Sequence, residues 1–348
     1  MVLTTDGVAV LAVCGFKNSG KTTLIEGVLP LLCARGISVA VVKHDAHGIQ
    51  FDRPGKDSDR FFRAGADVVI RGSNESAARW HPSQAPDLGQ TLARLGEGHD
   101  LVLVEGHKQT SLPKLWLLGE SGSEPPEDVT DIRRILPMSG DRTEIAVEEI
   151  SRLLDGAWRS RKVLAGVLVG GSSSRMGVPK QLIDRGGRTL IHRVIDGLGS
   201  VSTDPVLLGS GRVPDDLAGN RRLADAPGIP GPLGGLVSAL RWAPTDTWLV
   251  VACDQPSITR DAVDWLVAQR RPGRWAVLPR LGEGPVEPFL AVYEPQALAL
   301  LERLARSGAH GPWRIAGHEK VVSPQPPAEL TACWTNVNTP EDLDALHE

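Results

Sequence analysis

The segment GFKNSGKTT at residues 15–23 constrains the fold of this chain more than any other stretch. It holds every fixed position of the G-x-x-x-x-G-K-[ST] phosphate-binding loop, and it lies between an apolar run and an amphipathic stretch. Glycines let backbone N–H groups surround an anion, and the N-terminus of the following helix adds about half a positive charge. The segment therefore predicts a strand, a nucleotide-binding loop and a helix, with these residues contacting the nucleotide: Gly15, Asn18, Ser19, Gly20, Lys21, Thr22 and Thr23.

Within this loop we expect Lys21 on the β- and γ-phosphates and Thr22 on Mg²⁺. A second metal ligand is predicted at Glu105, which ends the apolar run DLVLVEG as the acid of a Walker B strand does. A glutamate at an ordinary strand end is the alternative. Nearby histidines lack the Cys partner or HExxH frame of a zinc site, so no zinc is predicted and their roles stay open: His44, His47 and His107.

The first half alternates Val-, Ile- and Leu-rich runs with helical patterns, which is typical of a parallel sheet covered on both faces. Strands are predicted at residues 8–14, 37–43, 100–106 and 113–118, and helices at 21–36 and 143–156. Gly156 is expected to stop the last helix, and residues 157–162 to form a polar joint. The pattern then restarts, with strands at 163–171, 204–209, 247–254, 276–279 and 288–293 and helices at 189–198, 258–270 and 295–308.

A second glycine-rich turn, GGSSSRMGVPK, follows the strand predicted at residues 163–171. It lacks the G-K-[ST] that opens a helix, so it is not a second Walker A loop. Nucleotidyl transfer needs a loop that wraps a triphosphate, cations that neutralise the leaving pyrophosphate, and a carboxylate for the bridging metal. Arg175 and Lys180 supply the cations, and Asp254 ends the strand TWLVVACD. A simple turn is the alternative for each piece alone.

Two downstream segments fit the same chemistry. The stretch LADAPGIPGPLGGL offers Asp225 and a glycine turn before a helix, which can line the base or the ribose. In the tail, Asn336 and Asn338 are two residues apart, so they share a face of an extended segment. Thr339 then caps a helix, with Pro340 at its first position and Asp342 at its third. Asparagines that merely form a turn before the cap are the alternative.

Composition bounds the possible partners. At 348 residues the chain is long enough for two domains, predicted at residues 1–158 and 159–348. A formal net charge of −4 gives no basic surplus for nucleic acid or a membrane surface, and no run approaches the roughly 20 apolar residues of a membrane span. The first residues are expected to form a buried strand rather than a signal peptide. Four scattered cysteines favour reduced thiols and a cytoplasmic location.

The motifs of the first half carry a resemblance. GFKNSGKTTLIE, VVKHDAHG, PGKDSDRFFRAGA and LVLVEGHK look like the molybdopterin-guanine dinucleotide biosynthesis protein B family, over roughly residues 8–150. The resemblance implies a small P-loop NTPase domain that binds GTP with Mg²⁺ and hydrolyses it slowly. It also implies an accessory role beside a guanylyltransferase, and a homodimer. The family usually has an aromatic residue at the position of His107.

The second half resembles the molybdenum cofactor guanylyltransferase family, through LVGGSSSRMGVPKQL, ADAPGIPGPLGGL, VVACDQP and NVNTPEDL. The resemblance implies a Rossmann-like nucleotidyltransferase domain with three α/β/α layers. It implies transfer of GMP from Mg·GTP to molybdopterin or Mo-molybdopterin, with release of pyrophosphate. Carried over by position, the nucleotide contacts are Leu168, Gly170, Gly171 and Asp225, the catalytic residues are Arg175, Lys180 and Mg²⁺-binding Asp254, and the pterin side has Asn336 and Asn338.

Departures from the family pattern keep alternatives open. Pro179 stands where Asp is usual, and Gly209 and Ser210 stand where an asparagine often helps to recognise the base. The run Lys180-Gln181-Leu182 resembles the molybdopterin cytidylyltransferases. The rival functions are therefore cytidylyl transfer to the same pterin, nucleotidyl transfer to a sugar phosphate, or a GTP-switched cofactor-delivery protein without transferase activity. Other molybdenum cofactor biosynthesis proteins or molybdoenzyme chaperones are the expected protein partners.

Two phosphate loops of different design on one chain suggest a fusion of an accessory GTPase with a transferase. Fusion holds tethered partners at a millimolar-scale effective concentration when the linker permits contact. We therefore expect the two loops to act side by side.

Overall fold

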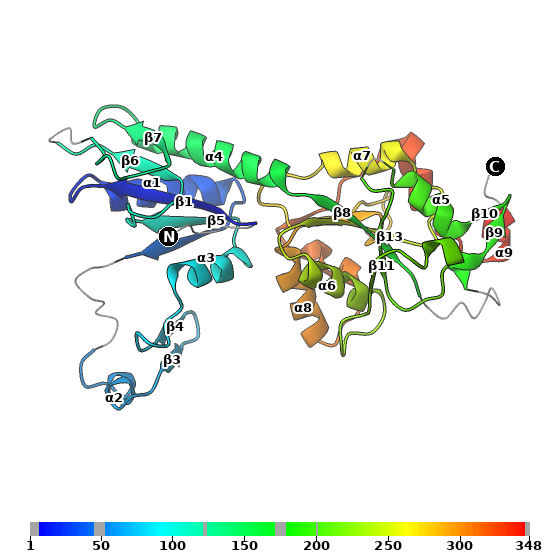
Figure 1. The fold of residues 1–348 in the computed structure, drawn as a ribbon, viewed down its shortest axis with the longest axis horizontal. Coiled ribbons are helices and arrows are strands. Elements are labelled where there is room, and N and C mark those ends of the chain that lie inside the picture. The colour runs from blue at the N-terminus through cyan, green and yellow to red at the C-terminus, as the bar shows by residue number, and fades with distance from the viewer. Residues whose placement is uncertain (1–6, 45–52, 121–123, 171–178, 200, 345–348) are drawn as a thin grey trace.

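The computed structural model describes residues 7–44, 53–120, 124–170, 179–199 and 201–344. It contains two α/β units that lie next to each other along the long axis of the molecule, each built on its own sheet (Figure 1). Helix α4 (Arg142–Ser160) runs from the first unit to the second, and the chain enters the second sheet three residues later at Val163. The prediction of an α/β fold with two sheets is confirmed.

The first sheet is parallel throughout, with the strand order β2-β5-β1-β6-β7. Its strands are β1 (Ala9–Gly15), β2 (Val39–Lys43), β5 (Leu101–Glu105), β6 (Lys114–Leu117) and β7 (Ile132–Leu136). Alternate residues of β1 face opposite layers, as the period of a strand requires. Leu11 packs with α1 (Lys21–Ala34) and α4, whereas Val10 packs on the side of α3 (Leu88–Gly96).

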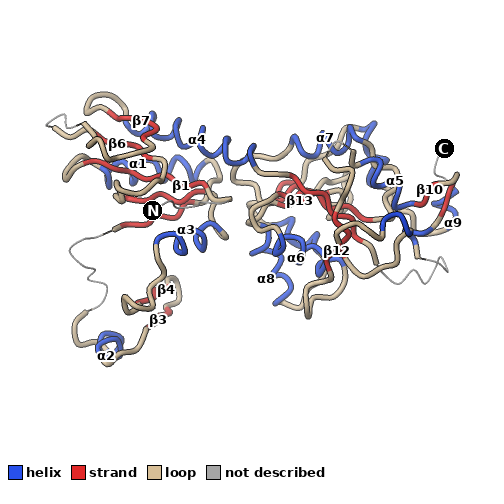
Figure 2. The backbone as a smooth tube through the Cα atoms, in the orientation of Figure 1, coloured by secondary structure: helices blue, strands red, loops and turns tan. Residues whose placement is uncertain are grey.

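A small antiparallel hairpin lies outside this sheet. It consists of β3 (Val68–Arg71) and β4 (Ser76–Arg79), and with α2 (Asp57–Arg63) it projects from the first unit (Figure 2). The carboxylate of Asp59 holds this segment together, because it accepts hydrogen bonds from the Gly55 backbone and from two arginines, Arg63 and Arg79. These contacts, the Gly55 bond first, hold the pKa of Asp59 below its usual value.

The second sheet is mixed, with the order β12-β11-β8-β13-β15-β14-β16. Its strands are β8 (Val163–Leu168), β11 (Val206–Leu208), β12 (Arg222–Leu223), β13 (Thr247–Ala252), β14 (Ala276–Val277), β15 (Ala291–Tyr293) and β16 (Val321–Val322). The first four are parallel to one another, and β15 is antiparallel to β13 and β14. Helices cover both faces, which gives the predicted three layers: α6 (Pro232–Trp242) and α8 (Ala297–Arg306) on one, α5 (Leu190–Gly197) and α7 (Arg260–Ala268) on the other.

Short elements complete the far end of the second unit. The hairpin of β9 (Asp184–Arg185) and β10 (Arg188–Thr189) leads into α5, and the tail forms α9 (Pro340–Asp344). At the start of α9, Asp342 N–H donates to Thr339 Oγ1 at 3.2 Å, while Thr339 N–H donates to Asp342 Oδ2 at 2.9 Å. The predicted cap of this helix is confirmed.

Helix α4 corrects one boundary. The sequence predicted a stop at Gly156 and a polar joint over residues 157–162, but the helix continues to Ser160. A glycine inside a helix costs about 1 kcal/mol relative to alanine. Burial of the Trp158 side chain, one turn after buried Leu154 on the same face, offsets that cost. Packing therefore decides the end of this helix.

The two units meet through a buried polar junction. Asp100, which directly precedes β5, has a side chain that is 0% exposed. Its carboxylate accepts a hydrogen bond from Trp275 Nε1 at 2.8 Å and pairs with Lys320 Nζ at 2.9 Å, both from the second unit. The backbone N–H and the hydroxyl of Ser38 donate to the same carboxylate. Because all of these groups are satisfied, the junction can bury charge.

A second buried cluster lies beside it. Arg161 donates to the carbonyl of Gly7 at 2.8 Å and to Glu294 Oε2 at 3.1 Å. Glu294 also accepts from Arg270 and from the hydroxyl of Thr247, the first residue of β13. Both side chains of the Arg161–Glu294 pair are almost fully buried, and burial is the main cause that lowers the pKa of Arg161.

These contacts join the two sheets by the amino ends of their parallel strands. A helix in an α/β unit runs antiparallel to its strands, so α4 ends at the amino edge of the first sheet. Strand β8 begins close to that end and runs away from the first sheet. At about 3.3 Å per residue, the segments from Gly7 to Gly15 and from Lys162 to Gly170 each extend roughly 25 Å from the junction. The first phosphate loop and the described residues that flank the second, Gly170 and Lys180, therefore lie on opposite sides of the junction, as the course of β1 and β8 in Figure 1 shows. The expectation that the two loops act side by side is wrong.

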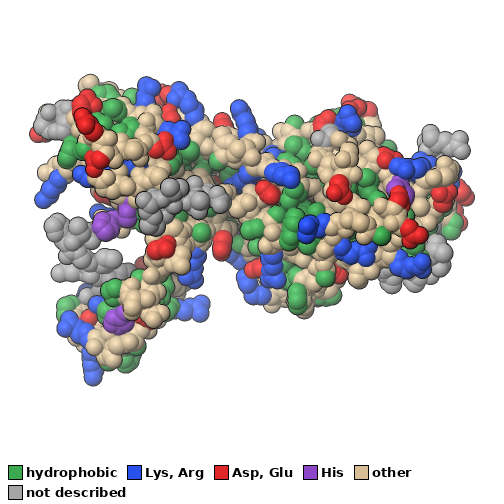
Figure 3. All heavy atoms as spheres, viewed as in Figure 1, with side chains coloured by type: hydrophobic (Ala, Val, Ile, Leu, Met, Phe, Trp, Pro, Cys, Tyr) green, Lys and Arg blue, Asp and Glu red, His purple; other side chains and the backbone are tan. Residues whose placement is uncertain are grey.

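Surface charge is mixed. Lys and Arg side chains are interspersed with Asp and Glu side chains over the face shown in Figure 3, in agreement with the net charge of −4. Among the described residues, no helix is both long enough and apolar enough to span a bilayer.

We predict that Lys320→Met destabilises the whole protein, because Asp100 then keeps a buried charge without its cation. Removing one partner of a buried pair costs about 3–5 kcal/mol, and urea unfolding monitored by circular dichroism measures it. Arg152→Met is the control, since the Arg152 side chain is 57% exposed and pairs with Glu148 and Glu149 of its own helix, and such surface pairs contribute about 1 kcal/mol or less. Equal losses in the two variants would contradict the junction described here.

Candidate nucleotide-binding sites

The first phosphate loop connects β1 to α1 at the carboxyl edge of the first sheet. Asn18 has a φ of 63° and Gly20 a φ of 87°, so the backbone turns through the left-handed region twice. A Cβ atom at Gly15 would lie 2.7 Å from the carbonyl oxygen of Leu117, which excludes any larger residue. This curled backbone, ending at a helix N-terminus, has the form of an anion-binding loop.

Inside this loop, Lys21 bends back over the backbone. Its ammonium donates to the carbonyl oxygens of Phe16 at 2.7 Å and Gly15 at 3.2 Å, so it lies across the loop where a phosphate group would bind. Thr22 Oγ1 donates to Glu105 Oε1 at 3.0 Å, which brings the two predicted metal ligands together. Hydroxyl and carboxylate oxygens are the donors that Mg²⁺ prefers, so this pair fits the predicted metal. Thr23 is exposed in the first turn of α1.

Two features of this site were missed from the sequence. Arg142, the first residue of α4, donates to the carbonyl of Ser19 at 2.9 Å and to that of Leu118. It therefore ties the phosphate loop to the end of β6. Lys43 lies 3.9 Å from Glu105. No local signal marks Arg142, and Lys43, although it lies in the motif VVKHDAHG, was given no role, because each acts through a neighbour that is distant in sequence.

The histidines form a pair next to Glu105. The rings of His44 and His107 lie 4.8 Å apart, and His107 has a φ of 56°, uncommon for a residue other than glycine. Burial, followed by the nearby His44, lowers the pKa of His107. His47 lies outside the described residues.

The second site is built where three distant segments meet. Lys180 begins a 3₁₀ turn (Lys180–Leu182), and its Nζ donates to Asp254 Oδ2 at 2.9 Å and to Asn338 Oδ1 at 2.7 Å. The structure thus brings together three of the predicted residues. Gly170 follows β8 at the same edge, whereas Gly171 and Arg175 lie outside the described residues.

Two oxygen atoms converge on one cation in this arrangement. The ammonium of Lys180 bridges the carboxylate of Asp254 and the amide oxygen of Asn338. Mg²⁺ in nucleotide sites is usually held by one or two protein oxygens together with substrate phosphates. The donor set therefore fits the predicted metal. In this structure the ammonium of Lys180 lies between the two oxygens that would hold the metal ion.

The tail segment is fixed to the strand that carries the carboxylate. The backbone N–H of Val337 donates to the carbonyl of Asp254 at 2.8 Å, and the Val337 side chain is fully buried. Asn336 and Asn338 flank it and are exposed. Asn338, predicted on the pterin side, thus contacts Lys180, which is predicted to be catalytic.

Asp225 lies at the same edge, after β12. The first turn of α6 passes close to it, since a Cβ atom at Gly235 would lie 3.4 Å from Asp225 Oδ1 and 2.9 Å from Leu168 Cδ2. Partial burial raises the pKa of the Asp225 carboxyl. Leu168 and Asp225 therefore lie together, as predicted for one wall of a nucleotide site.

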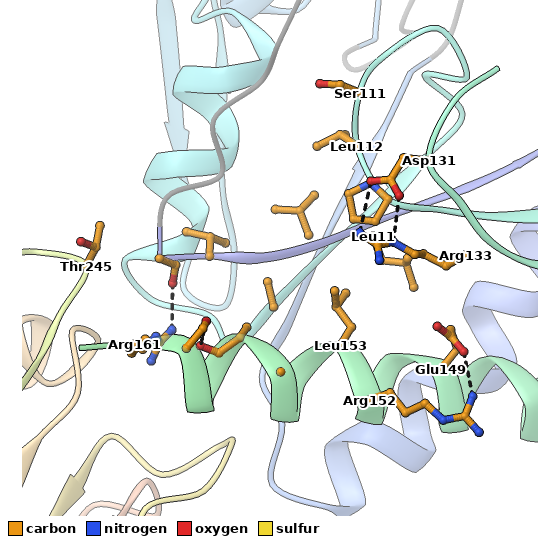
Figure 4. A pocket seen from close by; sticks show the side chains of 18 of the residues that line it. Leu11, Ser111, Leu112, Asp131, Arg133, Glu149, Arg152, Leu153, Arg161 and Thr245 are labelled. Carbon is orange, nitrogen blue, oxygen red and sulfur yellow. Dashed lines mark hydrogen bonds and ion pairs between the residues drawn. The ribbon is translucent and has the colours of Figure 1, made fainter. Parts of the chain in front are cut away.

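A cavity of about 800 Å³ lies elsewhere, at the junction of the two units (Figure 4). The exposed face of α4 and the amino ends of β1, β6 and β7 line it, and two ion pairs lie along its wall, Arg133 with Asp131 and Arg152 with Glu149. It opens at the edge of the sheet opposite to the phosphate loop, so it is not the site that the motifs predict.

The fold and these two sites define a protein with two nucleotide-binding α/β domains, one of the P-loop type and one of the nucleotidyltransferase type. Comparison with known families gives the same division. The family described as molybdopterin guanine dinucleotide synthesis protein B matches residues 10–136, and the MobA-like NTP transferase domain matches residues 165–322.

Individual relatives cover each half. The molybdopterin-guanine dinucleotide biosynthesis adapter protein of Haemophilus influenzae is 34% identical over 44% of this chain and 90% of its own length. A protein of Pelotomaculum thermopropionicum, described as a "probable molybdenum cofactor guanylyltransferase", is 31% identical over 51% of this chain and 88% of its own length. The chain therefore belongs to both families and is a fusion of an adapter domain with a guanylyltransferase-like domain of molybdenum cofactor biosynthesis.

One solved structure similar to the second half is molybdopterin-guanine dinucleotide biosynthesis protein A from Archaeoglobus fulgidus. It is 23% identical, and the match covers 52% of this chain and 94% of that protein with a TM-score of 0.41.

We predict that Gly211→Ala destabilises the second site. A Cβ atom there would lie 2.8 Å from both Gln181 Nε2 and the backbone nitrogen of Gly170, so the turn must move, at a cost of about 1–3 kcal/mol. Gly219→Ala is the matched control, because nothing lies within 4 Å of its added Cβ. Thermal unfolding of both variants is the measurement, and equal melting temperatures would refute the close approach.

Proposed function

We propose that the second domain transfers GMP from Mg·GTP to the terminal phosphate of molybdopterin or Mo-molybdopterin, giving the guanine dinucleotide and pyrophosphate. The observation that carries this proposal is the convergence of Lys180, Asp254 and Asn338 at the carboxyl edge of the second sheet. Membership of the guanylyltransferase family supports the choice of GTP and molybdopterin as substrates.

In this reaction, an oxygen of the pterin phosphate forms a bond to the α-phosphorus of GTP. The bond between the α-phosphorus and its bridging oxygen to the β-phosphate breaks, and pyrophosphate leaves with the electron pair. The attacking phosphate is already ionised, so no general base is needed. Catalysis then consists of positioning and charge neutralisation by Lys180 and Arg175.

Lys180 has to change partners when the nucleotide binds. Its ammonium now pairs with the carboxylate of Asp254 and donates to the amide oxygen of Asn338, and the incoming triphosphate offers it a more negative partner. Its departure frees two oxygens, which would hold Mg²⁺. When bound there, the ion neutralises phosphate charge and orients the triphosphate.

For the first domain, we propose GTP binding with slow hydrolysis. Lys21 would exchange the carbonyls of Gly15 and Phe16 for phosphate oxygens, and Thr22 and Glu105 would hold Mg²⁺. Because this loop faces away from the transferase edge of the same chain, its accessory role is exerted on other proteins. Enzymes of the same pathway and chaperones of molybdenum enzymes are the proposed partners.

We predict that Asp254→Ala lowers dinucleotide formation by about 10³-fold or more, because the phosphates then lose the carboxylate that holds their metal. The assay incubates the full chain with molybdopterin and GTP or CTP and measures the pterin dinucleotide and pyrophosphate. Asp264→Ala, an exposed carboxylate on α7, is the control and keeps wild-type turnover.

The outcomes of this assay distinguish the proposed function from its alternatives. Near-full turnover in Asp254→Ala refutes the metal site. Preference for CTP over GTP would replace guanylyl by cytidylyl transfer, the alternative that the run Lys180-Gln181-Leu182 favours. GTP consumption without pyrophosphate release by wild type would favour a delivery protein.

We further predict two independent GTP sites. Isothermal titration of wild type with Mg·GTP is expected to show two equivalents bound, and Lys21→Met and Lys180→Met are each expected to lose a different one. Because the two sites lie on opposite sides of the junction, the affinity of the remaining site changes by less than about twofold. A large change in the remaining site would show that the junction couples them.

A further inference from the structure

One buried side chain at the transferase edge has no role in the chemistry proposed above. Gln181 directly follows Lys180, and its side chain is 3% exposed. Its Nε2 donates to the carbonyl of Arg212 at 2.8 Å, and its Oε1 lies 3.9 Å from Cys253 Sγ as an acceptor. A buried amide with both ends engaged fixes the segments that it joins.

The amide of Gln181 joins the turn of Lys180 to two segments at the same edge of the sheet. Arg212 belongs to the loop after β11, and Cys253 follows β13 and precedes Asp254. The N–H of Gly211, next to Arg212, donates to the carbonyl of Val169 at the end of β8. The amide of Gln181 therefore ties the turn that carries Lys180 directly to the segments after β11 and β13, and Gly211 links the first of these to the end of β8.

Both partners suit an amide in particular. The thiol of Cys253 donates to Gln181 Oε1, with the sulfur and oxygen atoms 3.9 Å apart. The carbonyl of Arg212 needs a donor. A glutamine offers an acceptor and a donor at one end of a side chain, whereas an apolar residue of the same size leaves both partners unpaired.

We propose that Gln181 is a positioning residue for nucleotidyl transfer, which acts by holding the turn of Lys180 so that its ammonium reaches the triphosphate. This inference rests on the proposed function of the second domain. The turn is short, with Ile183 N–H donating to the carbonyl of Lys180 at 3.0 Å, so it has little internal hydrogen bonding of its own. Its position is set from outside, by the amide. A displacement of about 1 Å at a catalytic group can cost about 10²-fold in rate.

The test is a double-mutant cycle on the full chain with Gln181→Met and Lys180→Met. If Gln181 acts through Lys180, Gln181→Met lowers kcat by about 10- to 100-fold in wild type and by less than about twofold in the Lys180→Met background. Losses that multiply in the double variant would show a general structural role and overturn the inference. No loss in Gln181→Met would overturn it as well.

A matched control separates positioning from loss of stability. Gln296 is 1% exposed, and its amide also donates to a carbonyl, that of His99, but at the junction. Gln296→Met is expected to lower the melting temperature without lowering kcat. If Gln181→Met does not fold, Gln181→Asn replaces it, because it keeps the amide but shortens its reach by one methylene.

A binding measurement keeps this inference distinct from the proposed function. In the Lys21→Met background, which silences the first loop, Mg·GTP affinity reports on the second site alone. Gln181→Met is expected to weaken this binding about five- to tenfold, and to have no effect when Lys180 is also replaced. If wild type forms no pterin dinucleotide, the proposed function fails, and the binding measurement still tests the role of Gln181. Unchanged Mg·GTP affinity in Gln181→Met would overturn the positioning role of Gln181.

Discussion

The buried carboxylate of Asp100 is the interaction on which the arrangement of the whole molecule depends. Strands of a parallel sheet present their functional loops at the carboxyl edge, and their amino edge exposes backbone groups that need cover. Here the amino edges of two sheets cover each other. Asp100 from the first domain meets Trp275 and Lys320 from the second, and each of the two residues from the second domain directly precedes a strand. The polarity of the strands then places both nucleotide sites outward.

A junction made of charges favours one arrangement over others. A buried ion pair contributes little net stability relative to apolar packing, because both charges lose their hydration. A buried charge that has lost its partner destabilises the fold much more than the intact pair stabilises it. Any rotation of the domains would leave Asp100 and Lys320 without their partners and would break the hydrogen bond from Arg161 to the carbonyl of Gly7. We infer that this network defines a single relative orientation, which a short linker of residues 161–162 alone would not impose.

The sequence predicted the parts whose chemistry is local. A phosphate loop and a strand-end acid are recognisable from spacing, so Lys21, Thr22, Glu105, Lys180 and Asp254 were identified before the structure. Arg142 and Gln181 were not, because each acts on segments far away in the chain. The length of α4 was not predicted, because the burial of Trp158 outweighs the cost of Gly156 in the helix. A strand was predicted at residues 288–293, but its antiparallel direction was not, because a short strand carries no signal of its direction.

Joining two domains through their amino edges also changes what the fusion can accomplish. Effective concentration rises with tethering only when geometry lets both sites reach a common ligand. Back-to-back domains do not allow that within one chain. What the fusion does secure is equal amounts of both domains and an outward direction for each site. A molecule that binds at the second site therefore meets a different surface from one that binds at the first phosphate loop, and both can bind at once without competing.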